Sequence, residues 1–245
     1  MKLLKTFTAV LITVFFIACN FTEEIYFNEN GSGKMSISFD GGEMLQMLPE
    51  TDSTKLEKAI DSTLVFRDLL IEKKDSIAKL PLEEQEKLKR LEPFKLHMNV
   101  DPDKGIMNFD MFTEFNKVSE VNDAFNSFQS ASSIGPIAGG NAMPGGAPEE
   151  ATKVNYTFKK NKFKRETVIL DQTLFERSID SLAGAEMFLS SSTYTFKYHF
   201  PRRVKSTNIE EATFSMDGKT MVHEVNFLEM MKDPESIVIE VELEK

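Results

Sequence analysis

The sequence is poor in cysteine, tryptophan and positive charge. Its 245 residues contain one Cys and no Trp, and 29 Lys and Arg stand against 39 Asp and Glu. A single Cys excludes an intramolecular disulfide and any metal site built from several cysteines. The formal net charge of −10 argues against a nucleic-acid partner, because such proteins need a basic surface to neutralise phosphates.

The apolar content, by contrast, is sufficient for a folded core. Hydrophobic residues make up 41% of the chain, which excludes wholesale disorder, and the low count of 12 Gly excludes a collagen-like repeat. At about 150 residues per domain, the length corresponds to one or two domains.

The N-terminus has the form of a secretory signal peptide. Lys2 and Lys5 precede an uncharged stretch that ends at Ala18 and is shorter than the roughly 20 helical residues needed to span a bilayer. Ala18-Cys19 resembles the lipobox of bacterial lipoproteins. The resemblance implies that residues 1–18 are removed by cleavage between Ala18 and Cys19, and that Cys19 then carries acyl chains such as palmitate.

The alternative is an ordinary signal peptide followed by an incidental cysteine. The lipoprotein interpretation is favoured because the only Cys of the chain lies at the required position. Two or more acyl chains anchor a protein stably, because each CH₂ group buried in the membrane contributes about 0.8 kcal/mol to the binding free energy. Loss of Lys2 and Lys5 takes the net charge from −10 to −12, so attachment depends on lipid and not on attraction to anionic headgroups.

The residues after Cys19 give an indication of where in the cell the protein is located. The segment Asn20–Glu24 ends in two acidic residues and resembles the surface-export signals of some Gram-negative lipoproteins. We therefore expect a lipid-anchored protein of the cell envelope, in the outer membrane. Surface-facing and periplasm-facing positions both stay open.

Apolar periodicity predicts both strands and helices. We expect an α+β fold in which hairpins form antiparallel sheets and amphipathic helices pack against them, because adjacent hairpins do not suit a parallel doubly wound sheet. The expected strands are 25–27, 34–40, 94–100, 107–111, 153–159, 163–170, 193–200, 212–216, 220–227 and 236–243, and the expected helices are 43–48, 52–80, 82–91, 118–128 and 172–188.

A change of composition divides the chain. Residues 124–148 carry no charge and hold five of the 12 Gly. We interpret residues 132–150 as a flexible Gly/Pro-rich loop or linker. It separates an N-terminal α+β half, residues 19–131, from a C-terminal half, residues 151–245, and the two halves either fold separately or share one core.

No catalytic motif is visible in the sequence. His97, His199 and His223 form no short-spaced pair and no HExxH, so the sequence predicts no metal site, no cofactor and no catalytic residue. Asp101 and Asp103 lack the remaining ligands of a calcium loop, and we expect a hairpin turn there. An enzyme would need a site assembled from distant segments.

One basic cluster and one repeated motif are candidate sites. The basic cluster could form a cationic patch for lipid headgroups or acidic glycans, or could simply keep hairpin tips soluble. Its members are Lys159, Lys160, Lys162, Lys164, Arg165, Arg202 and Arg203. Four Asp-Ser pairs resemble the O-glycan acceptor of some Gram-negative envelope proteins, although Asp-Ser also caps helices. Their serines are Ser53, Ser62, Ser76 and Ser181.

Two stretches resemble the LppM-type envelope lipoprotein domain. The first comprises Cys19, residues 22–27, Asn30-Gly31-Ser32-Gly33 and a strand that ends at Asp40. The second comprises Tyr198-His199-Phe200-Pro201, Val204, Asn208 and the turn at residues 217–220 between two strands. The resemblance implies a lipid-binding α+β module and supplies no catalytic residues.

The leading hypothesis is a non-enzymatic, lipid-anchored envelope lipoprotein that binds or scaffolds a partner, either an envelope protein or a lipid. The 21 Phe and 13 Met leave open a lipid or glycolipid carrier, and an envelope hydrolase is the third hypothesis. A deep apolar pocket would favour the carrier, and a solid core with an exposed apolar patch the scaffold. Perturbed carboxylates around a histidine in a cleft would favour the enzyme.

Overall fold

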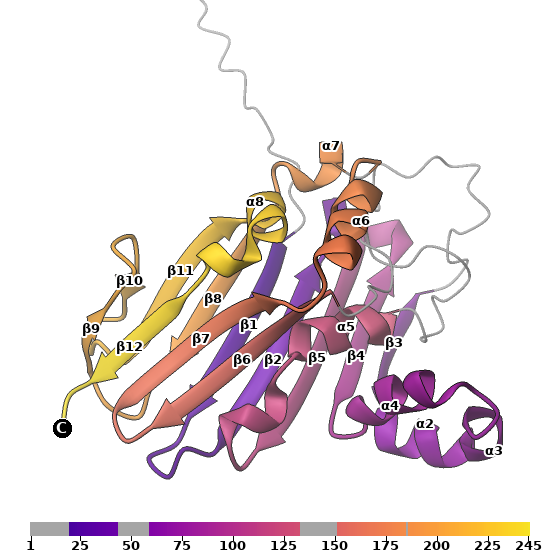
Figure 1. Ribbon diagram of the computed structural model, residues 1–245, viewed down its shortest axis with the longest axis horizontal. Coiled ribbons are helices and arrows are strands. Elements are labelled where there is room, and N and C mark those ends of the chain that lie inside the picture. Colours follow the sequence, from indigo (N-terminus) through magenta and orange to yellow (C-terminus); the bar gives the residue numbers. More distant parts are fainter. Residues whose placement is uncertain (1–19, 44–58, 133–150, 185) are drawn as a thin grey trace, which may run out of the picture.

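The computed structural model describes residues 20–43, 59–132, 151–184 and 186–245, which form two β-sheets with helices around them (Figure 1). The strands pair antiparallel with one exception. The predicted α+β class is therefore confirmed.

The larger sheet has eight strands. They are β1 (Asn20–Phe27), β2 (Gly33–Asp40), β3 (Ile60–Val65), β4 (Lys95–Asp101), β5 (Ile106–Phe115), β8 (Thr193–His199), β10 (Thr213–Phe214) and β11 (Thr220–Asn226). Their order is β10-β11-β8-β1-β2-β5-β4-β3. The parallel pair joins β1 to β8, so a strand from the start of the described chain lies beside one from beyond residue 150.

The smaller sheet covers part of one face of the larger sheet (Figure 1). Its strands are β6 (Thr152–Lys159), β7 (Lys162–Ile169), β9 (Val204–Thr207) and β12 (Ile239–Leu243), in the order β6-β7-β12-β9. Residues on both sides of the predicted linker contribute to one hydrophobic cluster between the two sheets.

Aromatic side chains fill much of the space between the sheets. Phe21, Ile25 and Phe27 of β1 alternate with polar residues and are buried. The ring centroid of Phe27 lies 5.2 Å from that of Phe163 on the facing sheet, and the Phe21 centroid lies 4.3 Å from that of Phe227. Each fully buried side chain of this kind contributes about 1.5–3 kcal/mol, so this layer is a major apolar contribution to stability.

Short helices lie at one end of the sandwich and along its sides. The α-helices are α2 (Phe66–Glu72), α3 (Lys74–Ile77), α4 (Leu82–Arg90), α5 (Ala124–Ser132), α6 (Gln172–Leu182), α7 (Glu186–Leu189) and α8 (Phe227–Lys232). The 3₁₀ turns are η1 (Pro102–Lys104), η2 (Val118–Val121) and η3 (Pro234–Ser236). Helices α6, α7 and α8 gather at the end where β1 begins, and α2–α4 lie beside the β3 edge (Figure 1).

Polar side chains cover the outer edge of β6. Asp123 Oδ1 accepts a hydrogen bond from Val154 N at 2.8 Å, and Asn122 Oδ1 accepts one from Tyr156 N at 2.8 Å. The N–H of Asp123 donates in turn to the Val154 carbonyl at 3.1 Å. These bonds satisfy backbone groups that an open edge strand would offer to another chain.

The predicted helix 52–80 is wrong over part of its length. Residues 60–65 form β3, which pairs antiparallel with β4, and α2 begins only at Phe66. Ile60, Thr63 and Val65 are β-branched, and their pairing with β4 outweighs the helical spacing of the apolar residues. Residues 52–58 of this predicted helix lie outside the described residues, as does most of the predicted helix 43–48.

The other predicted elements agree in type but differ at their ends. The predicted helix 118–128 is divided into η2 and α5, because Asn122 and Asp123 leave the helical conformation to bond β6. The predicted helix 172–188 is divided into α6 and α7, and strand 212–216 is reduced to β10. Strand β9 was not predicted, and most of the predicted linker 132–150 lies outside the described residues.

Candidate functional site

A carboxylate is buried at the centre of the sandwich. Glu23 follows the inward alternation of β1 between Phe21 and Ile25, and its side chain is fully buried. Burying a charge costs several kcal/mol unless another charge and hydrogen bonds compensate it. Glu23 therefore needs strong partners inside the core.

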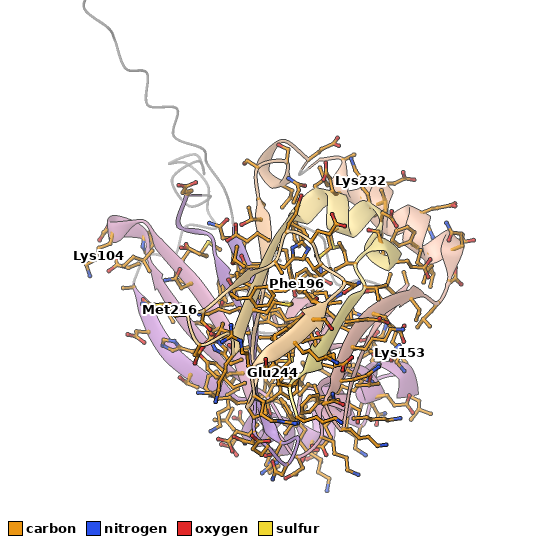
Figure 2. The ribbon with its side chains drawn as sticks, turned by 90° about the vertical axis from the view of Figure 1, so that its left-hand side faces the viewer. Lys104, Lys153, Phe196, Met216, Lys232 and Glu244 are labelled. Atoms are coloured by element: carbon orange, nitrogen blue, oxygen red, sulfur yellow. The ribbon has the colours of Figure 1, made fainter. Side chains whose placement is uncertain are left out.

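The main partner comes from the opposite sheet. Arg165 of β7 is 3% exposed, and its Nε lies 3.3 Å from Glu23 Oε1 and 3.4 Å from Oε2. One guanidinium nitrogen also donates to Thr167 Oγ1 at 3.3 Å, and the guanidinium carbon lies 4.6 Å from the ring centroid of Phe196. Figure 2 places Phe196 in the middle of the molecule. The ion pair thus joins the two sheets.

Tyrosines complete this buried cluster. The hydroxyls of Tyr198 and Tyr194 donate to the two oxygens of Glu23 at 2.5 and 3.0 Å. Burial, and then the nearby negative charge, raise the pKa of Tyr156, Tyr194 and Tyr198 well above the usual value, so all three stay protonated. Burial acts to lower the pKa of Arg165, but attraction to Glu23 and to the three tyrosines together outweighs it, and the pKa is raised.

This arrangement corrects one sequence-based interpretation and adds a structural role to another segment. Arg165 does not belong to a surface cationic patch, because β-strand alternation directs it into the core. Glu23, half of the acidic pair that resembled an export signal, is buried and holds Arg165. Glu23 thus has a structural role, and the export signal stays a prediction.

The neighbouring residue Glu24 organises a second cluster on the outer face of the larger sheet. Its Oε1 accepts hydrogen bonds from Lys197 Nζ at 2.9 Å, His199 Nε2 at 2.7 Å and the Tyr26 hydroxyl at 2.9 Å. Because the carboxylate can only accept, His199 Nε2 carries a proton and Nδ1 can accept from the Thr220 hydroxyl, 3.0 Å away.

The same cluster holds an aromatic stack. The rings of Tyr26 and His199 are parallel, with centroids 3.8 Å apart, and Lys34 Nζ lies 4.4 Å from the Tyr26 centroid. Each partner restricts the others, so these side chains form a fixed group on an otherwise open face of the sheet.

The environment shifts the pKa values of two carboxyl groups on this face in opposite directions. Partial burial acts to raise the pKa of Glu24, but hydrogen bonds from Lys197, His199 and Tyr26 outweigh it and hold the pKa below the usual 4.5. Asp110 of β5 has a raised pKa because burial outweighs the attraction of His97.

Two adjoining grooves cross this face. One, of about 590 Å³, extends from Tyr26 and Lys34 to Lys95, and the other, of about 640 Å³, extends from the same two residues to His199. They share Glu114 as well, so together they form one open trough across β4, β5, β2, β1 and β8, about 19 Å long at the usual strand spacing. Among the described residues, Lys34 and Lys95 have no carboxylate at ion-pair distance and are available to a ligand.

Thr220, His199 and Glu24 form a hydroxyl–imidazole–carboxylate series assembled from three strands. The Thr220 hydroxyl, which would be the nucleophile, lines neither groove of the trough. Glu24 is also shared with Lys197 and Tyr26, which reduces its influence on the imidazole. The geometry suits a rigid polar surface better than a nucleophilic site.

The cavity that reaches Arg165 is small. It measures about 60 Å³, is lined mainly by α5, α6 and α8, and reaches Arg165 and Thr167. Water occupies about 30 Å³ per molecule in the liquid, whereas pockets for drug-sized ligands measure about 300–1,000 Å³. This cavity has room for a few waters and is too small for a lipid acyl chain.

The other histidines lie apart from this cluster. His97 Nε2 lies 2.9 Å from Asp61 Oδ1 on the outer face, at the β3 edge. His223 faces the core beside Phe196, and burial lowers its pKa from the usual 6.5. Within the described parts of the chain, no group of three or more His, Cys, Asp and Glu side chains is arranged to hold a metal ion.

The remaining predicted residues are dispersed. Ser62 lies on β3, Ser76 on α3 and Ser181 on α6, and all three are exposed. Asp101 caps η1 and bonds Lys104, in the turn between β4 and β5. The O-glycosylation of these serines stays a prediction, and Ser53, Ala18 and Cys19 lie outside the described residues.

Only some of the residues predicted to form the cationic patch lie close together. Lys159, Lys160 and Lys162 lie at the β6–β7 turn, next to Arg202 and Arg203. Lys164, also predicted in the patch, lies farther along β7 and bonds Glu166 and Glu240. In the parts of the chain that the structure describes, no helix is long and apolar enough to cross a membrane.

Sequence reasoning missed both Glu clusters. The signal for Glu23 is present, because Phe21, Ile25 and Phe27 place it on the apolar side of a strand. Nothing local identifies Arg165 as its partner, since the two lie 142 positions apart.

Comparisons with known proteins give one structural likeness. No protein-family model matches the chain, and no curated protein matches it. The NMR structure of the folded domain of Mycobacterium tuberculosis LppM is similar, with 9% sequence identity and a TM-score of 0.41, over 92% of this chain and 88% of that one. The likeness is a weak structural one and transfers no residue role.

The Glu23–Arg165 pair predicts strong coupling between the two sheets. Glu23→Gln or Arg165→Met alone should lower the free energy of unfolding by about 3–5 kcal/mol, because the remaining charge stays buried and unpaired. The double variant should lose clearly less than the sum of the single losses. Urea unfolding followed by circular dichroism measures all three.

Lys164→Met is the matched control, since Lys164 lies on the other face of the same strand and is 40% exposed. It should leave stability nearly unchanged. Additive losses in the double variant would contradict the coupling.

The outer cluster predicts a pH effect. Because the pKa of Glu24 is lowered in the folded state, its contribution to stability is present above the usual 4.5 and is lost as the pH falls through the folded value. Lys197→Met should raise the pKa of Glu24 and reduce this loss, as read by carboxyl ¹³C NMR. Lys153→Met makes the same change on the smaller sheet and should leave the pKa of Glu24 unchanged. If the pKa of Glu24 were also unchanged in Lys197→Met, the proposed cluster would be contradicted.

Proposed function

We propose that this chain is a lipid-anchored protein of the cell envelope that binds a polar partner through the trough on the outer face of its larger sheet, without catalysing a reaction. The observation that carries the binding role is the trough itself. It is open, crosses five strands, and presents Lys34 and Lys95, which have no carboxylate at ion-pair distance among the described residues.

The position of Cys19 supports the anchoring role. Strand β1 begins at Asn20, and the Asn20 side chain accepts a hydrogen bond from Thr193 at 2.7 Å. An acylated Cys19 would therefore attach the lipid directly to a central strand, without a spacer. The end of the sandwich formed by α6, α7 and α8 would then face the membrane (Figure 1).

The small internal cavity makes the lipid or glycolipid carrier the weaker candidate. A carrier needs an apolar volume several times larger than the 60 Å³ cavity beside Arg165. The polar trough instead suits a partner that keeps its hydrogen-bonding groups. An outer-membrane location, facing the periplasm or the surface, is part of the proposal.

The anchoring predicts a specific modification. In cells supplied with an alkyne analogue of palmitate, the wild-type chain should be labelled and should begin at Cys19. Cys19→Ala should be unlabelled and should keep residues 1–18, because the modified cysteine directs the cleavage. Gel fluorescence and intact-mass measurement read both results.

Thr22→Ala, three residues along the chain, is the control and should be processed like the wild type. An unlabelled wild-type chain with an unmodified N-terminal amine would contradict the anchor and leave an ordinary signal peptide.

A further inference from the structure

Three turns meet at the end of the sandwich opposite Asn20. The β1–β2 turn, the β6–β7 turn and the segment after β8 pack together there. The ring centroids of Phe27 and Phe158 are 4.8 Å apart, and Arg202 donates to the Lys160 carbonyl at 3.4 Å. Because β1 has eight residues, this end lies about 25 Å from the first residue of the strand.

We call this end the distal tip and define it by its charged side chains. The cations are Lys159, Lys160, Lys162, Arg202, Arg203 and Lys205, and the carboxylates are Glu29, Glu242 and Glu244. In Figure 2, Glu244 lies low in the molecule, away from Lys104 and Lys232 at the other end.

The distal tip has an excess of positive charge in an acidic chain. Six cations stand against three carboxylates, while the whole chain has a net charge of −10. Glu242 is shared, since its carboxylate oxygens lie 3.9 Å from Lys162 Nζ and 2.7 Å from Lys205 Nζ. Among the described residues, Lys159 and Lys160 have no carboxylate at ion-pair distance.

Two features of the tip lower the stability of the fold. Lys159 lies directly opposite Lys162 in the β6–β7 pair, and like charges at such positions repel. Lys160 has a φ of 60°, a left-handed conformation that Gly or Asn adopts more easily. A turn shaped by stability alone would not carry lysine at both positions, so their charge has another use.

We infer that the distal tip binds an anionic polysaccharide. A polymer with repeated carboxylates can contact cations spread over three turns, and the excess charge is complementary to it. With the chain anchored at Cys19, which rests on the proposed function, the tip points away from the anchoring membrane. The tip therefore cannot reach the headgroups of that membrane, but it can reach a polymer of the adjoining envelope layer.

The test uses the full processed chain, attached through its anchor to phosphatidylcholine vesicles. Polygalacturonate is the anionic probe, neutral dextran is the uncharged one, and co-sedimentation measures binding. Polygalacturonate should bind and dextran should not. Its affinity should fall as NaCl is raised from about 0.05 M to about 0.3 M, because salt screens exposed charges.

Two variants separate binding from folding. Lys160→Gly removes both the charge and the unfavourable conformation, and Lys159→Glu replaces a like-charge pair with an opposite one. Each should raise Tm and weaken polygalacturonate binding by about threefold or more. Lys79→Glu, the same charge change at an exposed position between α3 and α4, should leave the affinity unchanged.

Wild-type affinity in both tip variants would overturn the inference, as would equal binding of dextran. The inference would also be overturned if the vesicles clustered with added phosphatidylglycerol vesicles and bound no polymer. That result would assign the tip to a second membrane. Failure of the chain to attach to vesicles contradicts the anchor alone, because polymer binding can still be measured on the free chain.

Discussion

The fold depends on one ion pair that crosses from sheet to sheet. Glu23 and Arg165 are both buried, and the charge of each is acceptable in the core only because the other is there. Two tyrosine hydroxyls and Thr167 supply further hydrogen bonds, and the ring of Phe196 lies against the guanidinium. A pair of this kind fixes the position of the smaller sheet on the larger one, because any slip would leave two uncompensated charges in an apolar interior.

The adjacent glutamates illustrate how a strand separates structure from function. Glu23 and Glu24 differ by one position, and the two-residue period of β1 directs one inward and the other outward. The inner carboxylate holds the sheets together. The outer one orders Lys197, His199 and Tyr26 on an open face, where the trough lies. The same strand would begin at the lipid anchor and end near the distal tip, so a single element relates the membrane, the trough and the tip.

Much of the fold could be predicted from local patterns, but the candidate site could not. The alternation in residues 34–40 and 193–200 gave their strands, and Asp217-Gly218 gave a turn. The strand at Ile60–Val65 was missed because its apolar spacing also suits a helix, and only pairing with β4 decides between them. The lysines next to Arg165 in the sequence predict a surface patch, whereas the structure buries Arg165. Its burial depends on Glu23, far away in sequence, and no local pattern carries that information.

The aromatic packing of the described core and an open polar face are together the basis for proposing a binding protein over a carrier. The core is filled by aromatic rings, and the cavity beside Arg165 is too small for an acyl chain. Native mass spectrometry of the chain released from its membrane in a nonionic detergent tests this most directly. The account predicts a polypeptide that begins at Cys19 and carries only its covalent acyl groups. A stoichiometric, non-covalently bound lipid that appears in the organic extract would contradict it and establish a carrier.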